Sequence, residues 1–499
     1  MPDNLIKKAY FTSLSRLLAS AANFLSQMII TPWIITHLGQ SLYGIFTLIN
    51  KTEGYLSLVD LRPSAILRLK LSTLQHVSEI SEKRKYVGAA IYISAICLPI
   101  IIFIGIIISF FFPIIFHISN EYIAISQTIV FLVALFLGLR SFLGIPEAIL
   151  RGNNLEYKGY LIEPLRCFVY GLFVYFSLTN NYGLLGVVMS SFASFVFSFV
   201  LRFLLQLKYA PGHSPQKPDK KHMHEFKNKG GWYMGASFAY QLLQSVDIII
   251  IGILYLPSFV ACYALTRALS IRVSESLSLL FSSMSSGIGF LWGKKDLASL
   301  VNIKIRLLRY NIMTGLILLF YFLLFNESFV ALWVGPENFM GQSANILICI
   351  MSPILILSIY SQSFIDSFLM FKYKLIVISI ASIINIITSI LLSFYWGILG
   401  IIAGGIISRS FVFLFFEKSI FKILNISVIG FLKSNANLVI IIIHYILMLY
   451  FYKNIIIESW IELIIHSTIY CVSAFLTVFL FILNKDEKKY IISKIKGQR

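Results

Sequence analysis

The sequence predicts an all-α integral membrane protein. Of its 499 residues, 58% are hydrophobic and only 13% are charged, whereas soluble domains carry roughly 25% charged residues. Apolar runs of about twenty residues recur along the whole chain, and each is long enough to cross a hydrocarbon core of roughly 30 Å. These runs are continuous in Ile, Leu and Phe, unlike the alternating segments of about ten residues that form transmembrane β-barrels.

About fourteen membrane spans are predicted from the apolar windows and from the charged, Gly, Pro or Asn breaks between them. The first span follows a basic N-terminal segment and is predicted to be retained, because no clear small-residue cleavage site accompanies it. The predicted spans cover residues 10–36, 42–66, 86–112, 122–148, 158–178, 183–207, 231–255, 259–287, 307–333, 343–368, 374–395, 397–417, 434–452 and 459–483.

Basic residues separate the connections between spans into two sets. Alternate connections are rich in Lys and Arg, and the connections between them contain a single basic residue, Lys453. Because Lys and Arg accumulate on the cytoplasmic side of a membrane, both termini and the segment 209–230 are predicted to be cytoplasmic. The formal net charge of +19 is then mainly a signal of topology and of contact with anionic lipid, and not of nucleic-acid binding.

The chain is predicted to contain two related halves. YGLLGVVMSSFASFVF at 182–197 resembles WGILGIIAGGIISRSFVF at 396–413, which indicates six-span repeats that share one orientation. The histidines of the Pro-, Gly- and Lys-rich segment between the halves, His213, His222 and His224, are interpreted as solvated. The predicted parts are an N-terminal six-helix lobe at 1–208, a cytoplasmic basic linker at 209–230, a C-terminal six-helix lobe at 231–420, an additional helix pair at 421–484 and a basic cytoplasmic tail at 485–499.

Several ionisable side chains lie inside predicted spans. An ionised group at the bilayer midplane costs at least ~2.5–3.5 kcal/mol, so it should face a partner or a watery cavity. A continuous helix over 42–66 would place Lys51 and Arg62 on one face, with Lys51 roughly 14 Å deep and Arg62 at the cytoplasmic mouth. Glu53 and Asp60 would lie on the opposite face, where pairing with neighbouring helices is expected.

The deepest charges are mainly cationic and come from both halves of the chain. Lys51, Arg267, Arg272 and Arg409, together with Arg62, predict a cavity for an anionic substrate. Structural ion pairs are the favoured explanation for the other charges within spans, Arg140, Glu147, Arg151, Glu163, Arg166 and Asp366. The predicted polar lining of the same cavity is Asn23, Gln27 and Gln244, and the candidate for coupling to an ion is Asp247.

Motifs for nucleotide hydrolysis and for other enzymatic chemistry are absent from the sequence. It contains no GxxxxGK[ST] motif, no catalytic triad and no metal-ligand spacing, and no soluble segment is long enough for a nucleotide-binding domain. The chain is therefore predicted to be a transporter and not an enzyme, and no cofactor or metal is expected. Transport against a gradient would have to draw on an ion gradient or on consumption of the product.

The arrangement of two six-helix lobes, two further helices and short outer connections resembles the MATE-like flippases of the MOP exporter superfamily. Three segments resemble Wzx-type O-antigen flippases within it: HLGQSLYGIFTL at 37–48, LVDLRPSAILR at 58–68 and DIIIIGILYLPSFVACYALTRAL at 247–269. The GLLG and GILG sequences that begin at residues 183 and 397 add to this likeness. The resemblance covers essentially the whole chain.

The resemblance implies a multi-pass protein of the bacterial inner membrane that takes part in polysaccharide and lipopolysaccharide biosynthesis. Its substrate would be an undecaprenyl-pyrophosphate-linked oligosaccharide, an O-antigen unit or a similar surface-polysaccharide unit, moved by alternating access with coupling to H⁺ or Na⁺. Membrane lipids and the polysaccharide polymerase machinery are the further partners it implies.

Two alternatives remain open, a MATE-type multidrug or cation antiporter and a flippase for the peptidoglycan precursor lipid II. Multidrug relatives often carry a carboxylate in the first span, where this chain has only Asn23 and Gln27. Because both of these side chains are uncharged, the antiporter is disfavoured. When the two halves are aligned with an offset of 220 residues, Gln27 corresponds to Asp247. The carboxylate at this position is thus found in the second lobe and not in the first span.

Overall fold

The computed structural model describes residues 2–57, 60–74, 80–283, 285–452, 455, 457–485, 487–489 and 493. These residues form helices and connections without a strand, so the predicted all-α class is confirmed. The chain forms two compact units, Met1–Ala261 and Cys262–Arg499. The first unit includes α9 because this helix packs on α1, α2 and α3, and the lobe limits given above stay a prediction.

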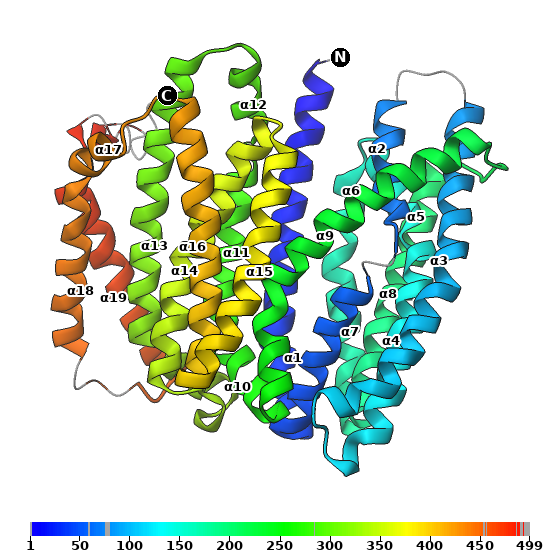
Figure 1. Ribbon diagram of the computed structural model, residues 1–499, viewed down its shortest axis with the longest axis horizontal. Coiled ribbons are helices and arrows are strands. Elements are labelled where there is room, and N and C mark those ends of the chain that lie inside the picture. The colour runs from blue at the N-terminus through cyan, green and yellow to red at the C-terminus, as the bar shows by residue number, and fades with distance from the viewer. Residues whose placement is uncertain are drawn as a thin grey trace. The chain divides into compact units, whose positions relative to one another are not determined.

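The first unit contains the helices up to the start of α10 (Figure 1). Within it, α3 packs along α4, α7 packs along α8, and α2 packs on α5. Its helices are α1 (Pro2–Leu56), α2 (Pro63–Thr73), α3 (Ile80–Ile115), α4 (Ile123–Leu143), α5 (Ile145–Gly152), α6 (Glu156–Tyr160), α7 (Ile162–Thr179), α8 (Gly183–Tyr209) and α9 (Lys220–Leu254), with a 3₁₀ turn at η1 (Asn120–Tyr122). The boundary between the two units falls within α10 (Pro257–Thr266).

The second unit is built around α13 to α16, where α16 packs on both α14 and α15 (Figure 1). A fully buried Lys304 on α13 forms an ion pair with Glu417 on α16, with 2.6 Å between Nζ and Oε1. The elements are α11 (Ala268–Ser283), α12 (Ser285–Gly293), α13 (Leu297–Val334), α14 (Gln342–Ser367), α15 (Phe371–Trp396), α16 (Ile398–Ile423), α17 (Val428–Ser434), α18 (Val439–Tyr452) and α19 (Trp460–Thr477), with 3₁₀ turns at η2 (Pro336–Asn338) and η3 (Ala436–Leu438) and a π-helical segment at η4 (Val478–Ile482).

Ten helices among the described residues are long and apolar enough to cross a membrane, or eleven if the bent pair Val428–Ser434 and Ala436–Tyr452 is one span. One of the ten, α1, covers two predicted spans and bends at Gly39, whose φ of 76° suits a residue without Cβ. The predicted spans at 231–255 and 259–287 correspond to the second part of α9 and to α10 and α11. The predicted spans therefore fall on helices of the structure, with the exception of 42–66, which is interrupted.

The predicted second span is not one continuous helix, and this corrects the expected helical face. Helix α1 ends at Leu56, and Arg62 adopts a left-handed conformation (φ 48°, ψ 54°) directly before α2. Pro63 disfavours the right-handed helical conformation for the residue that precedes it. Arg62 consequently does not continue the helical face on which Lys51 lies.

The segment predicted as a linker is only partly extended, because α9 begins at Lys220. Its extended part packs on α3, where Lys85 forms an ion pair with Asp219 at 2.9 Å between Nζ and Oδ2. The prediction that His222 is solvated is wrong. Its side chain is buried against Tyr86, and Nε2 lies 2.6 Å from Oε2 of Glu82. The apolar faces of α3 and α9 provide the packing that buries this histidine.

Candidate functional site

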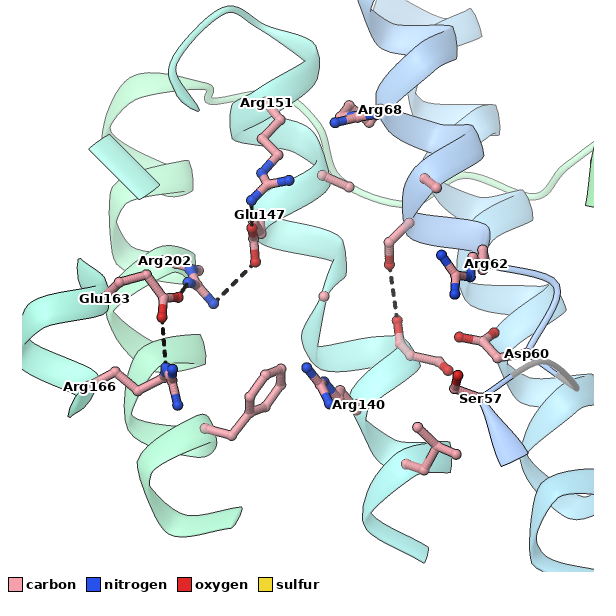
Figure 2. Close-up of a pocket in the computed structure, with 17 residues that line it drawn as sticks. Ser57, Asp60, Arg62, Arg68, Arg140, Glu147, Arg151, Glu163, Arg166 and Arg202 are labelled. Atoms are coloured by element: carbon pink, nitrogen blue, oxygen red, sulfur yellow. Dashed lines mark hydrogen bonds and ion pairs between the residues drawn. The ribbon is translucent and has the colours of Figure 1, made fainter. Parts of the chain in front are cut away.

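A polar cavity of about 660 Å³ lies inside the first unit, between α2, α4, α5, α7 and α8. Six arginines and three carboxylates line it, so positive charge is in excess (Figure 2). We call it the arginine cavity. Its lining residues are Ser57, Asp60, Arg62, Ser64, Ala65, Arg68, Leu137, Arg140, Ser141, Gly144, Glu147, Ala148, Arg151, Glu163, Arg166, Phe195 and Arg202.

Arg202 is the most deeply buried charge of this cavity. Only 3% of the residue is exposed, although it stands in the apolar sequence FSFVLRFLLQL of α8. Its Nη1 donates to Oε2 of Glu147 at 3.1 Å, and its Nη2 contacts Oε1 of Glu163. One guanidinium thus connects α8 with both α5 and α7.

The two glutamates that contact Arg202 are each shared with a second arginine (Figure 2). Arg151 donates to Glu147 at 2.5 Å, and Nε of Arg166 donates to Oε2 of Glu163 at 2.8 Å. This chain of charge-assisted hydrogen bonds fixes the geometry of the cavity wall. The prediction that these glutamates and arginines form structural pairs is confirmed.

The buried network keeps one donor without a partner. The Nε atom of Arg202 is inaccessible to solvent and makes no hydrogen bond in the described structure. Buried polar groups are nearly always satisfied in folded proteins. A ligand in the cavity would reach this atom only after the packing around Arg202 changed.

The remaining arginines of the cavity are more exposed. Nη1 of Arg140 lies 3.1 Å from Oε1 of Glu53, and the guanidinium carbon lies 4.7 Å from the centre of the Phe195 ring. Arg68 is 4.0 Å from Glu156. Because exposed ion pairs contribute only about 0–1 kcal/mol, these side chains can exchange their partners for a ligand at little cost.

Arg62 is positioned by the break between α1 and α2. Its side chain is exposed and projects toward the cavity from the residue that precedes Pro63 (Figure 2). It is the only one of the five predicted cationic site residues among the residues that line this cavity. Arg62 thus lines a cavity, as expected. It does so from a break between two helices, whereas a continuous helix had been expected.

The other predicted residues of the first unit are distributed along α1 and α9. Asn23 contacts the arginine network, because its Oδ1 accepts a hydrogen bond from Nη2 of Arg166 at 3.0 Å. Lys51 is half-buried on α1, and Gln27 is exposed. Gln244 donates to the hydroxyl of Tyr240 at 2.9 Å.

Asp247 is fully buried on α9. Its Oδ1 accepts a hydrogen bond from the backbone N–H of Ile248 at 3.0 Å, and its charge acts on the phenol of Tyr55. A carboxylate in such a position is costly unless its charge is balanced or its proton is exchanged.

Three predicted cationic residues belong to the second unit. Nη1 of Arg267 donates to the hydroxyl of Tyr263 at 2.9 Å, and Nη1 of Arg409 donates to the carbonyl of Gly405 at 3.1 Å. Arg272 is exposed and lies 3.4 Å from Glu275. In the same unit the predicted pairing of Asp366 is confirmed by Lys374, at 2.8 Å.

Sequence reasoning did not single out Arg68 or Arg202. The second of these had a detectable signal, because a lone arginine in a long apolar run must find a partner or a polar cavity. Among the described residues, no group of three or more His, Cys, Asp or Glu side chains is arranged to hold a metal ion. The charged groups of the candidate site are its arginines and their carboxylate partners.

The sequence matches no protein-family model and no curated protein. Solved structures are similar in fold. The chain superposes on the lipid II flippase MurJ in an inward closed conformation with a TM-score of 0.70 at 16% identity, covering 93% of this chain and 98% of the other. An inward-facing multidrug resistance MATE family transporter of the MOP superfamily gives 0.68 at 13% identity, covering 83% and 99%.

A MOP superfamily transporter from Pyrococcus furiosus, described as having a binding pocket of reverse polarity, gives a TM-score of 0.56 at 14% identity, covering 84% of this chain and 96% of the other. The chain therefore has the MATE-like fold of MOP superfamily transporters.

Proposed function

We propose that this protein is a flippase for a lipid whose head carries a pyrophosphate, with an undecaprenyl-pyrophosphate-linked oligosaccharide as its substrate. The arginine cavity would bind the pyrophosphate. The observation that supports this most directly is the excess of arginines over carboxylates in its lining. A cationic drug would meet repulsion in the same cavity.

The chemistry of the cavity suits this task. An anionic phosphate group cannot cross hydrocarbon without a replacement for its hydration. Guanidinium groups bind phosphate oxygens through two parallel hydrogen bonds, and they remain charged under all physiological conditions. The buried arginines would hold the head, and the exposed Arg62, Arg68 and Arg140 would give it a path of entry.

In this proposal the protein lies in the bacterial inner membrane and works by alternating access, a mechanism that its MATE-like fold supports. Exposure of the cavity to one leaflet and then to the other would carry the head across. In this proposal Asp247 takes up H⁺ or Na⁺ and couples the change of state to an ion gradient. Both termini would lie in the cytoplasm, where lipid-linked precursors with activated sugars are assembled.

A flippase for lipid II is the second candidate, since that lipid also carries a pyrophosphate head. The likeness in fold to MurJ, which extends over 93% of this chain, favours it. The recognised sugar distinguishes the two candidates, whereas the arginine cavity serves both.

Deletion of the gene, followed by examination of surface polysaccharide and of viability, separates these functions. Loss of surface glycan with normal viability and normal drug sensitivity is the expected result. Loss of viability would favour the lipid II flippase, and drug sensitivity alone would favour the antiporter. Purified protein in liposomes should also move a fluorescent polyprenyl-pyrophosphate sugar between leaflets, and protein-free liposomes are the control.

A further inference from the structure

A second cavity of about 470 Å³ lies within the first unit, between α1 and α7. In contrast to the arginine cavity, its lining is almost entirely apolar. We call it the apolar groove. Its lining residues are Ala22, Ser26, Ile29, Ile30, Trp33, Pro164, Cys167, Phe168, Gly171, Leu172 and Tyr175.

Each helix contributes one face to the apolar groove. The lining positions of both helices recur at spacings of three and four residues, which is the period of a single helical face. Gly171 leaves space at the centre, since a Cβ built there would be 3.6 Å from Cδ1 of Ile30. At one end, the rings of Trp33 and Tyr175 lie 5.4 Å apart between centroids.

The opposite end of the apolar groove meets the arginine cavity. Arg166 lines the arginine cavity, and the next residue, Cys167, lines the groove. The same atom, Oδ1 of Asn23, accepts hydrogen bonds from Nη2 of Arg166 at 3.0 Å and from Sγ of Cys167 at 3.4 Å. The arginine cavity and the apolar groove are therefore lined by neighbouring residues of α7.

We infer that the apolar groove binds the first part of the isoprenoid chain of the substrate while its pyrophosphate lies in the arginine cavity. This inference rests on the proposed function. A lipid with an anionic head and a long apolar chain matches two adjoining spaces of opposite polarity. The groove opens outward, because Phe168 and Ile29 are 66% and 57% exposed, so the remainder of the chain can stay in the bilayer.

Photocrosslinking tests the occupant directly. The photoreactive residue p-benzoylphenylalanine replaces Phe168 in the groove or, as a matched control, Leu165. Leu165 lies on the same helix and is 53% exposed, but it does not line the groove. The full-length protein is placed in nanodiscs of phosphatidylethanolamine and phosphatidylglycerol with tritiated undecaprenyl pyrophosphate.

The expected result is labelling at position 168 at least tenfold above labelling at position 165, with competition by unlabelled undecaprenyl pyrophosphate and none by added phosphatidylglycerol. Equal labelling at both positions would mean that the groove contains only bulk lipid, and it would overturn the inference.

A groove-filling variant provides a second measurement. Gly171→Leu should weaken binding of undecaprenyl pyrophosphate at least tenfold and leave binding of inorganic pyrophosphate unchanged, because the arginine cavity stays intact. Leu165→Phe, which adds bulk on the same helix outside the groove, should change neither. If Gly171→Leu does not fold, the crosslinking result at position 168 still decides.

The inference and the proposed function fail in different ways. If wild-type protein binds neither undecaprenyl pyrophosphate nor inorganic pyrophosphate, the proposed function is wrong and the inference falls with it. If both bind equally well and Gly171→Leu affects neither, the arginine cavity binds the head but the groove does not bind the chain.

Discussion

Nη1 of Arg202 on α8 lies 3.1 Å from Oε2 of Glu147 on α5, and the arginine is 3% exposed. The same guanidinium contacts Glu163 on α7. Three helices of the first unit are therefore held by one buried charge. Loss of one partner of such a network leaves the remaining buried charges with fewer hydrogen bonds, which is more costly than the loss of an exposed ion pair.

We expect Arg202→Ala to destabilise the protein by about 1–3 kcal/mol, because Glu147 and Glu163 would each lose a buried hydrogen-bond partner and keep only one arginine. The measurement is the amount of folded protein in the membrane and its melting temperature in detergent. Arg140→Ala, in which the lost side chain is 54% exposed, is the matched control and should change stability by about 0–1 kcal/mol.

The combined variant Arg202→Met, Glu147→Gln, Glu163→Gln, Arg151→Met and Arg166→Met should recover part of this loss, since it removes all charges of the network together. A melting temperature of Arg202→Ala equal to that of Arg140→Ala would show that the network is not structural.

Arg62 should be required for transport and not for folding. Its left-handed backbone costs an ordinary residue about 1–2 kcal/mol, whereas Asn and Gly tolerate this conformation. Arg62→Asn and Arg62→Gly therefore remove the charge without added strain. We expect both to reduce flipping in liposomes at least tenfold at normal membrane levels.

Arg62→Lys should retain part of the activity, because it keeps the charge but loses the two-pronged hydrogen bonding. Normal flipping by Arg62→Asn would exclude Arg62 from the path of the substrate.

Asp247 is the residue expected to couple transport to an ion. In Asp247→Asn the side chain keeps its size and loses its charge, so flipping should no longer accelerate when a pH or sodium gradient is imposed across the liposome. Exchange in the absence of a gradient should persist. Asp247→Glu is the control that keeps a carboxylate. If the Asn variant still responded to both gradients like the wild-type protein, Asp247 would not be the residue that couples transport to an ion.

The predicted topology can be tested with reporter fusions. Fusions at residue 215 and at the C-terminus should give a cytoplasmic signal, because both lie in the Lys- and Arg-rich set of connections. A fusion at Asn181, in a connection without basic residues, should give the opposite signal and serves as the control. The same signal from residues 181 and 215 would disprove the fourteen-span arrangement.

Local features of the site were predictable from the sequence. Glu163 and Arg166 are three residues apart on one helix, and Glu147 and Arg151 are four apart, so their pairing follows from helical geometry alone. The membrane class and the approximate spans were likewise predictable, because each depends on the polarity of one continuous segment.

Features that depend on distant segments were not predictable in this way. The expected helix over 42–66 treated the apolar run as continuous, whereas the chain breaks before Pro63 and turns Arg62 toward the cavity. The pairing of Arg202 with Glu147 and Glu163 joins residues far apart in the chain, and it depends on how α5, α7 and α8 pack.

The sequence by itself determined that the chain is an all-α membrane protein with its cationic residues placed inside otherwise apolar segments. The tertiary structure alone decided which of these residues converge. Hydropathy identifies each membrane helix separately, because a helix satisfies its backbone hydrogen bonds within its own segment. The position of a charge relative to another helix is set by side-chain packing between segments, and it was this packing that assembled the arginine cavity from five helices.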